Sequence, residues 1–159
     1  MSTTMEVVYQ SSLLANAAYV TFDAPDYLSP SGNIADVAWS QETSGGESFS
    51  ERGFTHPQFE EFQRTYRVLH HQPDSATGFS ATLFENVSTG ELHLAFRGTN
   101  GAMDVLQDAS LAVTLAVQFG DWLQNGAVET FLRDAGLIDA NGAAMPEYAG
   151  RIQLSGHSL

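Results

Sequence analysis

The residues with the clearest chemical potential lie at the end of the chain, where a short strand-like segment leads to a serine. Ile152, Gln153 and Leu154 predict a strand, and the sequence continues as Ser155-Gly156-His157-Ser158-Leu159. Gly156-x-Ser158 is the first part of the G-x-S-x-G nucleophile elbow. In an elbow, a tight turn exposes the serine hydroxyl and aims the next backbone N–H at a developing oxyanion. Taken alone, these residues would also suit an ordinary Gly-x-Ser turn.

A second strand also ends in residues suited to such a reaction. Leu92 to Asn100 reads L-H-L-A-F-R-G-T-N, so an apolar segment closes with Arg97-Gly98-Thr99. An oxyanion hole takes one N–H from the residue after the nucleophile and one from an earlier strand-to-helix loop. Leu159 and Thr99 would fill these two places. A strand-ending turn with a solvated arginine is the alternative, but its combination with the elbow favours the catalytic interpretation.

The two motifs together resemble those of the class 3 lipases, which are serine esterases of the α/β-hydrolase fold. L-A-F-R-G-T, Asp108 and L-S-G-H-S-L carry the resemblance. It extends over most of the chain, because a leading helix and a hairpin before F-R-G-T also suit that family. The segment Gly78–Phe84 resembles in particular the bacterial branch of the family. One departure is visible, since Asp104-Val105-Leu106 stands where family members often have a tryptophan.

The resemblance implies a role for each matching residue. Ser158 matches the nucleophile, and Thr99 matches the oxyanion-hole residue. Asp108 matches an aspartate that orients the threonine side chain. His157 matches a structural histidine of the elbow, not the catalytic base, and Arg97 resembles a buried arginine that supports the oxyanion loop. The implied activity is hydrolysis of acyl-lipid or other carboxylic esters, and we expect no cofactor and no metal ion.

Periodicity and turn residues predict the elements that must position these groups. We expect helices over Val7–Val20, from Pro57 onward, over Met103–Phe119 and over Asp121–Ala135, the last of them with a stop at Gly136. We expect strands over Tyr66–His71, Gly78–Phe84, Leu92–Phe96 and Arg151–Leu154. A short element is expected within Ile34–Trp39. The two middle strands should form an antiparallel hairpin. The last strand could pair parallel with an earlier one. The expected fold class is α/β, as the N-terminal portion of an α/β-hydrolase fold with an incomplete sheet.

A serine hydrolase also needs a histidine base and an acid that orients it. In the α/β-hydrolase order both follow the serine, but only Leu159 follows Ser158 in residues 1–159. The remaining histidines are His56, His70, His71 and His93. None occupies a family position for the base, and we expect surface or packed histidines. We therefore expect the N-terminal part of one lipase-like domain with little turnover alone. A non-catalytic hydrolase-fold remnant or an acidic interaction module is the alternative.

Composition narrows the class of partner. The chain has 159 residues, with six arginines, no lysine and 19 acidic side chains, which give a formal net charge of -13. This excess of negative charge counts against nucleic-acid binding, because almost nothing is available to neutralise phosphates. The absence of cysteine excludes a disulfide framework and a cysteine nucleophile. The expected partner is a lipid or small ester substrate.

No segment of the sequence predicts a signal peptide or a transmembrane helix. Met1–Gln10 carries no positive side chain, and the longest apolar run, Leu111–Phe119, is about half the roughly 20 residues that a spanning helix needs. We expect a protein that is cytoplasmic or is secreted without an N-terminal signal peptide. The apolar side of Met103–Phe119 could form a lid that opens towards a lipid interface, and a plain buried helix is the alternative.

Overall fold

The computed structural model describes residues 4–24, 26–40, 47–73, 80–97, 126–148 and 150–156, with a four-stranded mixed sheet at their centre. The strands are β1 (Tyr66–Gln72), β2 (Ala81–Asn86), β3 (Leu92–Phe96) and β4 (Ile152–Gly156), in the order β1-β2-β3-β4. β1, β2 and β3 pair antiparallel in succession, whereas β4 pairs parallel with β3. The α/β class, the hairpin and a parallel partner for the last strand are thus confirmed.

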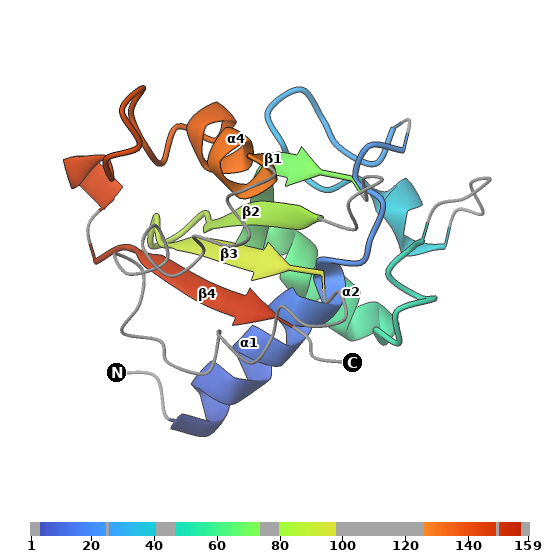
Figure 1. Ribbon diagram of the computed structural model, residues 1–159. Helices are drawn as coiled ribbons and strands as arrows, with labels where there is room; N and C mark the ends of the chain where they lie inside the picture. The colour runs from blue at the N-terminus through green and yellow to red at the C-terminus, as the bar shows by residue number, and fades with distance from the viewer. Residues whose placement is uncertain are drawn as a thin grey trace.

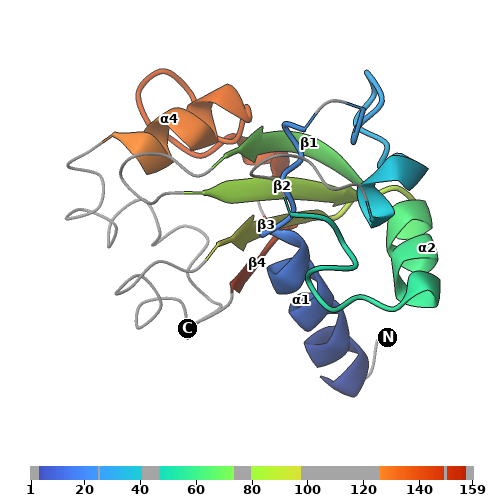
Figure 2. The same ribbon diagram turned by 90° about the vertical axis from the view of Figure 1, so that its right-hand side faces the viewer.

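Helices cover both faces of this sheet. α1 (Thr4–Ala17) and α2 (His56–Thr65) lie on one face and α4 (Ala127–Asp134) on the other, as Figure 1 and Figure 2 show. Two short 3₁₀ segments, η1 (Asp36–Trp39) and η5 (Pro146–Tyr148), lie in the connections. Side chains alternate along a strand, so β2 and β3 contribute to two cores. Phe84 and Ala95 belong to the core on the α1 side, and Leu83 and Leu94 to the core on the α4 side.

Aromatic rings fill the core on the α1 side. Phe62 of α2 is 2% exposed, and its ring centroid lies 4.8 Å from that of Tyr66 and 5.5 Å from those of Phe49 and Phe84. Edge-to-face and tilted pairs at these distances are attractive beyond the area that they bury. The cluster therefore fixes α2 against β1 and β2, and with them one side of the sheet.

Local sequence explains where two of the helices begin or end. Thr55 and Gln58 form a capping box at the start of α2, in which each side chain bonds the backbone N–H of the other residue. The helix therefore starts one residue before Pro57, and the predicted element is confirmed. Gly136 follows α4 with a positive φ of 73°, a conformation that favours glycine, and this confirms the expected stop.

Other predicted boundaries are wrong by a few residues. The first helix is displaced towards the N-terminus relative to Val7–Val20, because the chain turns after Ala17 and the Val20 N–H bonds to the Ala17 carbonyl only three residues earlier. The last strand does not include Arg151, which lies in a turn, and it continues through Gly156. The extension matters for the site, because it carries the strand geometry as far as the glycine of the elbow motif.

Some expected elements lie wholly or partly outside the described residues. Met103–Phe119 is one of them, and of Asp121–Ala135 the structure describes only the part from residue 126 onward, where α4 is helical. The expected strand Gly78–Phe84 is described from Ser80, and β2 occupies its later part and continues to Asn86. No helix in the described ranges is long and apolar enough to cross a membrane.

Candidate functional site

The ends of β3 and β4 form the frame of the candidate site. The two strands run in the same direction (Figure 1), and Phe96, the last residue of β3, is the register partner of Gly156, the last residue of β4. Parallel strands in register finish at the same edge of a sheet, about 4.8 Å apart. The segments that carry the F-R-G-T and G-H-S motifs therefore leave the sheet side by side.

The residues that the sequence assigns to catalysis follow β3 and β4 in the sequence. Ser158, Leu159, Thr99 and Asp108 all fall outside the described residues, as does the elbow histidine His157. Their assigned roles remain predictions. Of the two motifs, the structure describes only the strand portions and the first residue after β3.

That first residue, Arg97, is held by both its backbone and its side chain. Its backbone N–H donates to the Ser80 carbonyl at 3.1 Å, which continues the β2–β3 pairing by one step. Its guanidinium carbon lies 5.2 Å from the ring centroid of Tyr19, and the Arg52 guanidinium lies 4.0 Å from the same centroid. These cation–π contacts tie the end of β3 to the turn after α1. Arg97 is half-buried, whereas the resemblance implied a buried arginine.

A row of paired residues crosses the sheet beside this edge. His71 pairs with Thr82, Thr82 with Ala95, and Ala95 with Ser155. Neighbouring strands lie about 4.8 Å apart, so about 14 Å and three strand spacings separate His71 from Ser155. A general base works within about 3 Å of the proton that it removes, or through one water. His71 is therefore not placed to act directly at the end of β4.

The surroundings of His71 are those of a buried structural histidine. Its Nδ1 hydrogen-bonds with Thr82 Oγ1 at 2.8 Å, and its ring packs edge-on against Phe22 at 5.5 Å between centroids. Burial lowers the pKa of His71 to about 4, and the nearby charge of Asp23, whose Oδ1 is 3.7 Å from Nε2, opposes that shift only in part. The imidazole is consequently neutral near pH 7. The sequence pattern gave no signal of this burial.

A β-bulge in β1 determines which face of the sheet each of the two neighbouring histidines, His70 and His71, occupies. The register shifts between Val68 and His70, and His70 then packs its ring 4.9 Å from that of Phe131 on the α4 side. His56, at the start of α2, is exposed and packs 4.9 Å from the Trp39 ring. These contacts agree with the expectation of packed or surface histidines.

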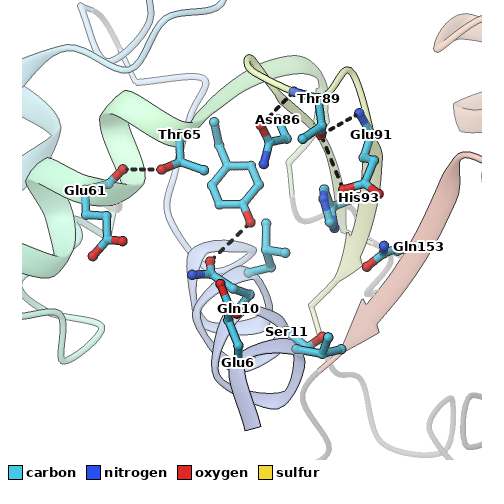
Figure 3. Close-up of a pocket in the computed structure, with 13 residues that line it drawn as sticks. Glu6, Gln10, Ser11, Glu61, Thr65, Asn86, Thr89, Glu91, His93 and Gln153 are labelled. Carbon is cyan, nitrogen blue, oxygen red and sulfur yellow. Dashed lines mark hydrogen bonds between the residues drawn. The ribbon is translucent and has the colours of Figure 1, made fainter. Parts of the chain in front are cut away.

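A pocket lies at the start of β3, at the opposite end from the edge where β3 and β4 both finish, which we call the motif edge. It has a volume of about 600 Å³ and is bounded by α1, the end of α2 and the turn between β2 and β3 (Figure 3). His93 and Tyr66 line it. No role was predicted for either residue, although a histidine within the otherwise apolar Leu92–Phe96 segment was a signal of a special position.

Neither the search for metal-ligating side chains nor the comparisons with known proteins assigns a function to the chain. Within the part of the chain that the structure describes, no group of three or more His, Asp or Glu side chains is arranged to hold a metal ion. No family model, curated protein or solved structure matches the chain. The functional interpretation therefore depends on the motifs and on the geometry of the sheet.

Proposed function

We propose that this chain carries the nucleophile and the oxyanion hole of a serine ester hydrolase similar to the class 3 lipases, with an α/β-hydrolase fold. Ser158 Oγ attacks the acyl carbonyl carbon of a lipid or other carboxylic ester. The N–H groups of Thr99 and Leu159 bind the oxyanion, and Asp108 orients Thr99. The alcohol leaves, and water then hydrolyses the acyl-enzyme.

The observation that carries the proposal is the parallel pairing of β3 with β4. Phe96 and Gly156 are register partners at the ends of β3 and β4. The segment after β3 and the segment after β4 therefore start from two points about 4.8 Å apart. An antiparallel pairing would instead have sent the two motifs to opposite ends of β3, roughly 15 Å apart along its five residues. The parallel arrangement supports the proposal, because both segments start from the same edge of the sheet and can supply donors to one reacting carbonyl.

The general base in such a reaction is a histidine held by an acid. Among the described histidines, His71 is the one at the same edge of the sheet, and about 14 Å separates it from β4. The test should therefore use the longest reading frame that contains residues 1–159, so that any base encoded with them is present.

A fluorophosphonate probe followed by peptide mapping tests the proposal. The probe should label Ser158, and Ser158→Ala should abolish both the labelling and the hydrolysis of a p-nitrophenyl ester. Ser155→Ala is the matched control, because Ser155 Oγ is buried without a hydrogen-bond partner among the described residues, so its removal leaves no group unpaired. That variant should keep the label. A folded protein without label at Ser158, or an active Ser158→Ala variant, would overturn the proposal and favour a non-catalytic module.

A further inference from the structure

A second and smaller pocket lies beside the motif edge. It has a volume of about 200 Å³, and its walls are the turn after α1, the end of β1, the residue before β2 and the residue after β3. Sites for drug-sized ligands have volumes of roughly 300–1,000 Å³. This pocket therefore suits a small polar part of a substrate and not a long acyl chain.

Two opposite charges line this pocket. One is the guanidinium of Arg97, which is half-buried, and the other is the carboxylate of Asp23, whose side chain is 51% exposed and open to a ligand. Asp23 Oδ1 lies 3.7 Å from Nε2 of His71, a third lining residue. Because burial lowers the pKa of His71 to about 4, the imidazole adds no charge near pH 7. The pocket is consequently dipolar, with one positive and one negative wall.

The positive wall is notable in a protein with six arginines, no lysine and 19 acidic side chains. Two of the six arginines lie against the ring of Tyr19, Arg52 at 4.0 Å and Arg97 at 5.2 Å from its centroid. Glu47 pairs with Arg52 at 3.0 Å, and Arg52 is not among the lining residues. Arg97 is thus the cation of this pocket. The planar fork of a guanidinium matches the oxygens of a phosphate or a carboxylate.

The order of the strands sets the order of the two charges. Arg97 follows β3, the strand next to β4, whereas Asp23 contacts His71 of β1, three strand spacings from β4. An ester bound past the ends of β3 and β4 therefore meets Arg97 first and Asp23 second as it extends into the pocket. A substrate with its cationic group nearer the ester bond would place that group against Arg97, and like charges repel.

We propose that this pocket holds the alcohol part of the ester substrate, and that this part carries an anionic group such as a phosphate near the ester bond and an ammonium group farther from it. The anionic group accepts hydrogen bonds from Arg97, and the ammonium group donates to Asp23. A glycerophospholipid with a zwitterionic headgroup has its charges in this order. The assignment rests on the proposed esterase function and adds the class of substrate.

Three esters with the same acyl and glycerol groups test the order of charges. They are dihexanoylglycerol, dihexanoylglycerophosphate and dihexanoylglycerophosphoethanolamine, each below its micellar concentration, assayed with the longest reading frame that contains residues 1–159. We expect kcat/KM to rise in that order, because each added group meets one charge of the pocket. Equal values for the three esters, or a lower value for the zwitterionic ester than for the neutral one, would overturn the proposal.

Charge variants assign each step to one residue. Asp23→Asn should lower the kcat/KM ratio of the ethanolamine ester to the phosphate ester about threefold, the effect of one exposed charge pair. Arg97→Gln should lower the ratio of the phosphate ester to the neutral ester about tenfold, and this ratio cancels any change in the oxyanion loop that acts on both esters. Asp134→Asn and Arg133→Gln on α4 make the same changes in net charge and should leave both ratios unchanged. Equal effects of the pocket and α4 variants would show general electrostatic attraction and refute the site.

Binding of glycerophosphoethanolamine, which has no acyl ester, separates this proposal from the esterase proposal. NMR titration should give saturable shift changes at the backbone amides of Thr21 and His71, which line the pocket. Hydrolysis of a p-nitrophenyl ester without such binding, and without a preference among the three esters, would refute the pocket and leave the esterase proposal intact. Saturable binding without hydrolysis of any ester would refute the esterase proposal and the substrate role with it, and the pocket would then be a site for a free zwitterion.

Discussion

Acid should destabilise this protein through His71, and the size of the effect follows from its burial. The imidazole is packed against Phe22 and bonded to Thr82, and its pKa is lowered from 6.5 to about 4. Between these two values the unfolded chain binds a proton at His71 and the native chain does not. The free energy of unfolding therefore falls as the pH falls through this range, and His71 is fully protonated in both states only below pH 4.

The magnitude can be worked from the two pKa values. Proton linkage gives a loss of about 2 kcal/mol between pH 7 and pH 5, and about 3 kcal/mol once the pH is below the native pKa. Such a loss is a large share of the 5–15 kcal/mol that is typical of a domain. Asp23 moderates the effect, because its charge favours the protonated imidazole.

Urea unfolding at pH 7 and pH 5, followed by tryptophan fluorescence, measures this loss. His71→Gln is the comparison, since glutamine can still hydrogen-bond with Thr82 but does not titrate. Between the two pH values, the free energy of unfolding of the variant should fall by about 2 kcal/mol less than that of the parent. The contributions of the other histidines cancel in this comparison, because both proteins contain them. Equal losses within about 0.5 kcal/mol would refute the assignment of a buried, neutral His71.

Two further predictions concern the packing of the fold and are measured by urea unfolding. Phe62→Ala should cost about 3–5 kcal/mol, because it empties the centre of the aromatic core, and a cost below about 1 kcal/mol would contradict that packing. Gly32→Ala should lower the free energy of unfolding more than Gly53→Ala does. Both glycines have positive φ, 83° and 81°. An added Cβ would overlap the Val68 carbonyl at Gly32, whereas it would meet nothing within 4 Å at Gly53. The Gly53 change should cost about 1–2 kcal/mol for the backbone alone, and the reverse order would be inconsistent with the described path of residues 26–40 beside β1.

The elements that could be predicted are those that local residues specify. The capping residues Thr55 and Gln58 and the positive-φ Gly136 determine helix ends within one turn of chain. The β2–β3 hairpin depends on a turn in which Asn86 Oδ1 accepts from the N–H groups of Ser88 and Thr89. Each of these acts over a few positions, so each is visible in the sequence.

Features that depend on contacts between distant segments were not predictable. The bulge between Val68 and His70 reverses the faces of the following residues, and it buries His71 while its neighbour packs against α4. The pocket at His93 forms only because α1 lies beside the β2–β3 turn. The strand pattern predicted that β4 could pair parallel, but the choice of β3 as its partner required the three-dimensional structure. The catalytic assignments past the motif edge stay predictions.

The same pairing also sets the order in which the nascent chain can assemble. β1, β2 and β3 pair through residues no more than twenty positions apart, whereas Leu92 and Ile152 are separated by sixty. Pairings between distant residues form slowly, because a long loop must close first. The antiparallel strands can therefore meet while β4 is still being synthesised, and β3 offers an open edge throughout that interval. Until β4 has been synthesised and pairs with β3, a strand of another chain could pair with that edge instead.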